Sequence, residues 1–308
     1  NEKFLEIDPN NLSIPIILSN STPLELRIKA AHKAYTNNLI SIESLAALYQ
    51  SVDFNSEELN NPKKTLERYK ASNELIMAYY YQLVNIQIFP SSRLSVIFDF
   101  WQFAETIDLE KISYNLTYNI ISSIEPSSDK LNFGNDIATA LIYNNDYENA
   151  SKWIIFSENS NDSTQELEKV KLLYDLYKSS DSQKILEYIN NNFENLKDNQ
   201  SANFKEILYV ILYVFDQNTQ TNSSLIFEKI MDERKVPTIF LYSKIEEAIN
   251  NKDEFNLLML LLMSINEKEW NQIHPEHLKL VLRGIKNYKN SKLLKNIILN
   301  IFENNKIL

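Results

Sequence analysis

The scarcity of glycine constrains the fold of this chain more than any other feature of its sequence. Only 2 of its 308 residues are glycine, whereas roughly 7% is average. Phosphate-binding loops, dinucleotide-binding turns and tight β-hairpins need glycine where the backbone takes a positive φ or approaches a ligand closely. Helices have no such requirement, so the sequence predicts an all-α protein.

Composition argues against several functional classes. The net charge of -10 and the pI of about 5.0 disfavour binding to nucleic acid, because an acidic surface repels a phosphate backbone. The absence of cysteine excludes a disulfide framework, a thiolate metal site and a cysteine nucleophile. The longest apolar runs, 207–215 and 257–263, are far shorter than the roughly 20 residues of a membrane span. We expect no membrane-spanning segment, no metal and no cofactor.

Apolar residues recur with helical spacing between short polar links. Leu24, Ile28, Ala31 and Tyr35 share one helical face, and a second helix is predicted to begin near Ser41, so the two form a hairpin. The run 207–215 also has the composition of a buried strand, but residues 203–206 supply a helical first turn and no partner strand is nearby. The later predicted helices are 62–70, 73–88, 94–104, 109–123, 135–143, 170–177, 182–193, 204–215, 224–231, 237–250, 253–264, 275–288 and 291–302, with Gly134 in a turn.

Three segments are expected along the chain. Residues 1–20 contain Pro9 and Pro15 and lack a helical period, which predicts an extended N-terminal arm. The polar run 157–163 is the candidate boundary between a helical-repeat half at 21–156 and a second at 164–308. The same run could also be a long loop between helices.

One helical hairpin resembles the centre of a tetratricopeptide repeat. In the segment 140–150, Asn145 stands where that family has glycine, Tyr147 where it has an aromatic residue and Ala150 where it has alanine. Asparagine tolerates a left-handed turn better than most residues. The predicted fold is an α-solenoid of antiparallel helix pairs, tetratricopeptide-like, with eight or nine pairs at about 34 residues each.

A second resemblance covers about the first quarter of the chain. It rests on Leu24, Arg27, Ala30 and Ala31, and on the stretches 42–49, 52–62 and 78–82. These residues resemble the opening of an uncharacterised alphaproteobacterial family of exported helical-repeat proteins. The resemblance implies a helical-repeat fold and an exported, periplasmic or cell-envelope location, with a cytoplasmic location as the alternative. It implies no activity and no site residues.

Two short motifs could carry chemistry. His274 and His277 flank Pro275 and Glu276 and could share a metal, but no third ligand is evident and Pro275 marks a helix start. We therefore expect both histidines to be exposed turn residues. Glu43-Ser44 matches the catalytic Glu-Ser dipeptide of lytic transglycosylases, but no glycine-containing catalytic core follows it. The sequence predicts no catalytic residue and no enzyme.

Aromatic clusters supply the candidate binding residues, which are Tyr79, Tyr80 and Trp101. Aromatic side chains anchor interfaces, and solenoids present them from inner helices. Neighbouring positions point about 100° apart, so most of these rings are expected in the core. The predicted function is a non-catalytic scaffold for protein-protein or cell-envelope interactions, with a protein as partner. The alternatives are a ligand- or glycan-binding helical protein, or an enzyme with dispersed carboxylates related to envelope turnover.

Overall fold

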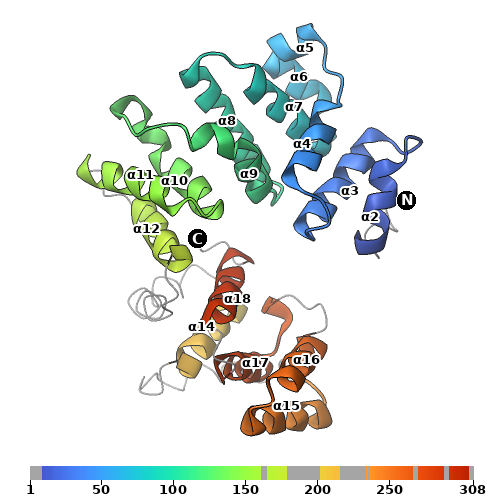
Figure 1. The fold of residues 1–308 in the computed structure, drawn as a ribbon, viewed down its shortest axis with the longest axis vertical. Coiled ribbons are helices and arrows are strands. Elements are labelled where there is room, and N and C mark those ends of the chain that lie inside the picture. The colour runs from blue at the N-terminus through green and yellow to red at the C-terminus, as the bar shows by residue number, and fades with distance from the viewer. Residues whose placement is uncertain are drawn as a thin grey trace. The chain divides into compact units, whose positions relative to one another are not determined.

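Helices make up every regular element of the chain that the structure describes (Figure 1). The structure is a computed structural model, and it describes residues 9–160, 165–178, 202–215, 234, 236–265, 270–287 and 291–304. These ranges contain no strand, and the all-α prediction is confirmed. The run 207–215, whose composition also suits a strand, lies in a helix. The helices predicted at 182–193 and 224–231 lie outside the described residues.

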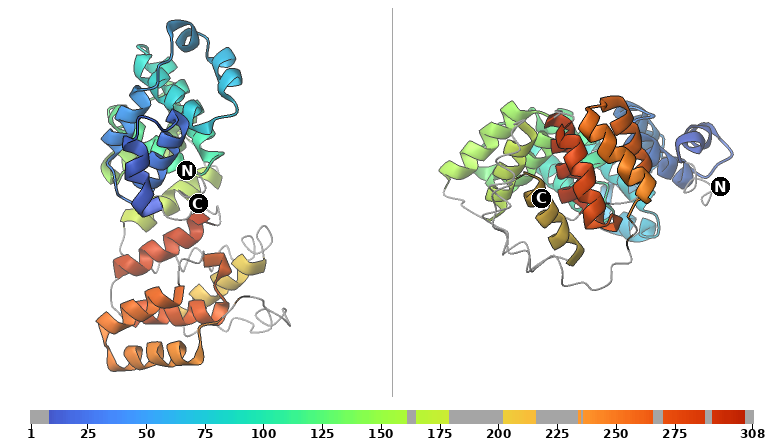
Figure 2. Two further views of the ribbon diagram at one scale, coloured as in Figure 1. Left: turned by 90° about the vertical axis from the view of Figure 1, so that its right-hand side faces the viewer. Right: turned by 90° about the horizontal axis from the view of Figure 1, so that it is seen from below.

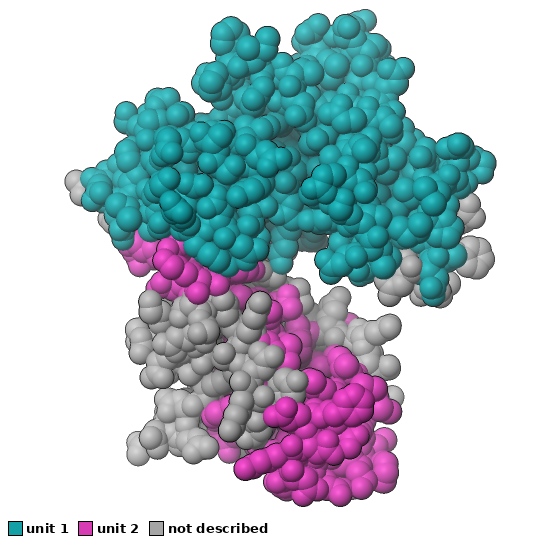
Figure 3. All heavy atoms as spheres, in the orientation of Figure 1, with its two compact units in different colours: residues 1–163 teal, residues 164–308 magenta. Residues whose placement is uncertain are grey.

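The chain divides into two compact units, which comprise residues 1–163 and 164–308 (Figure 3). The division falls at the end of the polar run 157–163. Unit 1 contains α2 (Pro9–Leu18), α3 (Leu24–Thr36), α4 (Ile42–Gln50), α5 (Ser56–Asn60), α6 (Pro62–Tyr69), α7 (Asn73–Ile86), α8 (Pro90–Glu105), α9 (Glu110–Ile121), η1 (Ser128–Phe133), α10 (Gly134–Tyr143) and α11 (Tyr147–Asn159). Most of these helices pack against the helix that precedes or follows them in sequence.

The N-terminal segment is helical, so the predicted extended arm is wrong over Pro9–Leu18. Its apolar side chains Leu12, Ile16 and Ile17 pack against α3, and Arg27 Nε donates to the Ile17 carbonyl at 2.8 Å. A proline inside a helix removes one backbone donor. Burial against α3 outweighs this loss at Pro15, which a reading of local sequence cannot foresee.

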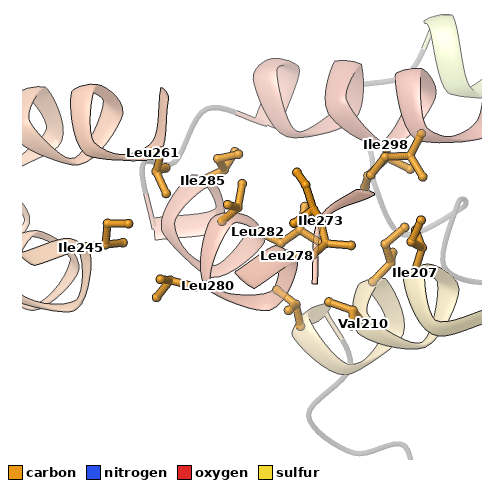
Figure 4. Close-up of a cluster of buried hydrophobic side chains, with 14 of the residues drawn as sticks. Ile207, Val210, Ile245, Leu261, Ile273, Leu278, Leu280, Leu282, Ile285 and Ile298 are labelled. Carbon is orange, nitrogen blue, oxygen red and sulfur yellow. The ribbon is translucent and has the colours of Figure 1, made fainter. Parts of the chain in front are cut away.

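Unit 2 is built around one central helix, α17 (Pro275–Asn287). It packs against α14 (Ala202–Phe215), α15 (Ile239–Asn251), α16 (Glu254–Ile265) and α18 (Ser291–Asn304). Figure 4 shows Leu278 and Leu282 of α17 between side chains of these neighbours, among them Ile207 of α14 and Ile245 of α15. The unit also contains α12 (Gln165–Lys178) and η3 (Trp270–Gln272). Because four helices share α17, its apolar side chains form the centre of the unit's core.

Four turns between helices share one backbone conformation. Asn38, Asp108, Asn145 and Lys252 each have a φ between 56° and 61°. In each turn the residue's own N–H bonds the carbonyl three positions back, and the next N–H bonds a carbonyl five positions back, as in Asp146 to Leu141 and Asp253 to Ala248. This pattern closes the C-terminus of the first helix and satisfies its last carbonyls. The predicted left-handed turn at Asn145 is confirmed.

Neither glycine has a positive φ, because Gly134 is the first residue of α10 and Gly284 lies within α17. The prediction of a turn at Gly134 is wrong. A Cβ at Gly134 would lie 3.0 Å from Ser157 Oγ of α11, and one at Gly284 would lie 3.1 Å from Leu261 Cδ1 of α16. The two glycines therefore allow neighbouring helices to approach closely.

Helix ends recur at nearly even intervals along the chain. The ends of α3, α6, α8, α10, α12, α14, α15 and α17 lie 33 to 38 residues apart, at Thr36, Tyr69, Glu105, Tyr143, Lys178, Phe215, Asn251 and Asn287. Six of these helices are followed by a second described helix, namely α4, α7, α9, α11, α16 and α18. Two helices joined by a short link form an antiparallel pair. Figure 2 shows such pairs in further views of both units.

Candidate interaction surface

Two of the three predicted binding residues lie in the core of unit 1. Tyr79 is 0% exposed and its hydroxyl donates to the Glu58 carbonyl at 2.9 Å. Trp101 is 4% exposed and its indole N–H donates to Thr117 Oγ1 at 3.0 Å. A direct contact between either ring and a partner would require that ring to leave the core.

Tyr80 is half-buried and packs between aromatic side chains of α8. Its ring stacks on Phe100 at 5.9 Å between centroids and lies 5.8 Å from Phe103. Burial, with the nearby Asp99 carboxylate as a smaller cause, raises the pKa of the Tyr80 hydroxyl to about 12. The hydroxyl is therefore neutral at physiological pH, and the binding role predicted for Tyr80 stays a prediction.

A buried histidine joins α3 to α4. His32 Nε2 and the Tyr49 hydroxyl are hydrogen-bonded at 2.5 Å. Burial lowers the pKa of His32 to about 4 and raises that of Tyr49 well above its ordinary value. Gln82 of α7 donates to the carbonyls of Tyr49 and Val52, so this region is linked to a third helix. Both rings are neutral and enclosed, which suits a structural hydrogen bond.

Glu58 is the centre of the polar network of unit 1. Its carboxylate accepts from the Asn55 backbone N–H at 3.0 Å, Arg68 at 2.7 Å and the Tyr69 hydroxyl at 2.8 Å. The bond from Asn55 N–H, followed by that from Tyr69 and the charge of Arg68, lowers the pKa of this carboxyl. The three donors hold the ionised carboxylate in place and link α5 to α6.

The histidines of the His274–His277 motif have different environments. His277 is buried in α17, where its Nε2 is hydrogen-bonded to Ser264 Oγ of α16 at 2.9 Å, so the prediction of an exposed turn residue is wrong for it. His274 Nδ1 accepts from the Glu276 N–H at 3.2 Å at the start of α17. Throughout the described ranges, no group of three or more His, Cys, Asp or Glu side chains is placed to hold a metal ion.

The clearest surface feature of the described chain is the outer side of α16. Leu257 and Leu261 point into the core, and both contact the position of Gly284. On the opposite side, Phe255, Met259, Leu262 and Met263 are exposed. The spacings of four and three residues place these four side chains on one stripe. The helix is thus apolar on both sides, although the described chain covers only one.

The first turn of α15 and Val236, which precedes it, add further exposed apolar side chains. The antiparallel pairing of α15 with α16, joined by Lys252 and Asp253, places this turn beside the end of α16 that carries Met263. The pair lies at the edge of unit 2 in Figure 1. We call the combined surface the α15–α16 apolar face; its seven residues are exposed by 48% to 87% and are Val236, Ile239, Phe240, Phe255, Met259, Leu262 and Met263.

Charge is distributed unevenly between the two units. Residues 1–163 contain 21 acidic and 12 basic side chains, giving -9, whereas residues 164–308 contain 20 and 19, giving -1. Residues 236–265, which contain α15 and α16, carry two basic and four acidic side chains, of which Lys244 and Glu247 form an ion pair at 2.7 Å. Unit 2 therefore exposes apolar residues on a nearly neutral background.

No helix in the described part of the chain has both the length and the apolar character needed to cross a bilayer. Comparison with known proteins found no matching family model, no matching curated protein and no matching solved structure. The α15–α16 apolar face therefore rests on the geometry of this chain alone. Its sequence signal is the spacing 255, 259, 262 and 263, which the length of the apolar run 257–263 does not reveal.

Proposed function

We propose that this chain is a non-catalytic helical-repeat scaffold that binds protein through the α15–α16 apolar face. The exposed stripe on α16 is the observation that carries the proposal. Monomeric soluble proteins rarely expose a contiguous apolar patch larger than about 300–600 Å², and larger patches usually mark interaction sites. Seven large side chains that are about half or more exposed amount to roughly 1,000 Å².

The chemistry of the face fits a protein partner. Methionine is flexible and polarizable, so Met259 and Met263 can adapt to a partner's side chains. Phe240 and Phe255 supply rigid area of the kind that anchors interfaces. A helix of the partner laid along α16 would meet apolar residues at each turn, which is a recurring mode of recognition.

The repeat architecture is part of the same proposal. The near-even helix ends and the four identical turns support an array of tetratricopeptide-like helix pairs. In such an array each pair packs on its neighbours, so a pair with an apolar outer side offers a surface for another molecule. Export to the periplasm or cell envelope, expected from the resemblance, stays a prediction.

Capture with a double variant tests the proposal. The experiment compares the tagged chain with its Leu262→Glu/Met263→Glu variant. Each is incubated with lysate and treated with a short photo-crosslinker that does not depend on amines. Mass spectrometry then identifies the crosslinked proteins. We expect at least one crosslinked protein that the variant loses. The control is Ile155→Glu, which charges an exposed apolar residue of unit 1 and should retain the product.

Both variants must keep the far-ultraviolet circular dichroism of the parent chain. If folded parent and folded double variant give the same products, or none, the α15–α16 apolar face is not a protein-binding surface. Specific capture of a small molecule or glycan would favour the ligand-binding alternative.

A further inference from the structure

We propose that the partner of the α15–α16 apolar face is a second copy of this chain, with α16 packed antiparallel on α16 about a two-fold axis at Met259. This inference rests on the proposed function, since it identifies the occupant of the same surface. Three properties of the face support it.

The first property is the symmetry of the stripe. Phe255 and Met263 lie four residues before and four residues after Met259, and all three are exposed. In an antiparallel pair centred on Met259, each Phe255 ring meets the Met263 thioether of the other copy, a favourable sulfur–aromatic contact. A surface of this kind is self-complementary, as a two-fold interface requires.

The second property is the size of the face. Its seven side chains present on the order of 1,000 Å², and a stable interface of standard size buries about 800 Å² on each partner. The face is large enough for a stable dimer without any contribution from unit 1.

The third property is charge. Two copies of a chain with a net charge of -10 repel one another. Of this charge, -9 belongs to residues 1–163, whereas residues 164–308 carry -1. Residues 236–265, which contain α15 and α16, carry two basic and four acidic side chains, a net charge of -2, and one of the acidic ones, Glu246, is paired with Arg283 at 3.0 Å. Self-association through α16 thus involves the less charged of the two units.

Single cysteine variants test the register, because the parent chain has no cysteine. A residue on the two-fold axis lies opposite itself, within the Cα separation that a disulfide can bridge. We expect Met259→Cys to form a covalent dimer on mild oxidation, at least about ten times faster than the control Ile155→Cys, because the dimer raises the effective thiol concentration. Phe255→Cys and Met263→Cys should each dimerise slowly alone and crosslink to one another when mixed.

Light scattering after size-exclusion chromatography gives the oligomeric state without crosslinking. We expect the parent chain to have twice the mass of a 36.1 kDa monomer, and Met259→Glu to be monomeric with an unchanged circular dichroism spectrum. A monomeric parent over the whole concentration range, or equal crosslinking at positions 155 and 259, overturns the inference. If that monomer still captures another protein through Leu262 and Met263, the proposed function survives without the second copy. If it captures nothing, both fail.

Discussion

The α10–α11 pair of unit 1 and the α15–α16 pair of unit 2 have the same turn and different outer sides. In both, a residue with φ near 60°, Asn145 or Lys252, ends the first helix. In both, an aspartate that follows it accepts a hydrogen bond from the backbone three residues later. The outer side of α11 carries Lys152 and Glu158 with one exposed apolar residue, Ile155, whereas that of α16 is apolar along its length.

This comparison separates the residues that build a helix pair from those that give it a surface. The turn and the inner side are constrained because backbone groups must be paired and apolar side chains buried. The outer side is free of both constraints when it faces water. The fold of the helix pair therefore does not require the apolar outer side of α16.

The largest difference should follow from truncating one aromatic residue in each pair. Trp153 of α11 is buried against α10, whereas Phe255 of α16 is 75% exposed. We expect Trp153→Ala to lower the free energy of unfolding by about 3–5 kcal/mol because it leaves a cavity. In the monomeric Met259→Glu background, where no contact between copies contributes, Phe255→Ala should lower it by less than about 0.5 kcal/mol. Urea denaturation followed by circular dichroism measures both. Similar losses would show that the Phe255 ring is already covered in the isolated chain.

The second largest difference is expected in the stability lost when one ion pair of each unit is broken. Arg234 and Glu206 of unit 2 form an ion pair whose side chains are mostly buried, and Lys64 and Glu57 of unit 1 form one that is mostly exposed. Arg234→Gln leaves a buried carboxylate without its counter-charge and should cost about 3 kcal/mol. Lys64→Gln should cost less than about 1 kcal/mol, because water screens the exposed pair. Equal costs, measured by thermal unfolding, would contradict the burial of Arg234.

Acid should weaken unit 1 through His32. Its pKa is about 4 in the folded chain and about 6.5 when unfolded, so the unfolded state binds more protons between these values. The stabilising contribution is complete above pH 6.5 and is lost as the pH falls towards 4, by about 3 kcal/mol in total. His32→Gln removes this titration, so its unfolding midpoint should vary less between pH 7 and pH 4 than that of the parent. Parallel pH profiles for the two chains would refute the assignment.

The smallest effect concerns the shared turn. A left-handed conformation costs most L-residues roughly 1–2 kcal/mol, but asparagine less and glycine almost nothing. We expect Lys252→Gly to raise the free energy of unfolding by about 1 kcal/mol and Asn145→Gly by a few tenths. Differential scanning calorimetry can resolve the two melting temperatures. A greater gain at Asn145 would mean that the Lys252 side chain itself stabilises its turn.

The sequence predicted what depends on local chemistry. Helical periodicity and polar links located the helix pairs, and Asn145 marked a left-handed turn because its side chain tolerates one. Features that depend on tertiary packing were mispredicted. Pro15 lies inside a helix because α3 buries its neighbours, and Gly134 begins α10 at a position where Ser157 leaves little room for a Cβ. Periodicity likewise cannot tell which side of an all-round apolar helix such as α16 will be covered.

The placement of the two glycines also affects the denatured state. Glycine has the largest backbone freedom to lose on folding, and its removal stabilises a protein mainly by reducing the conformational entropy of the unfolded chain. Here the left-handed turns use Asn, Asp and Lys, and the two glycines lie only where helices touch. The unfolded chain therefore has less backbone freedom to lose on folding than a chain of ordinary glycine content, so its scarcity of glycine lowers the entropic cost of forming the helices.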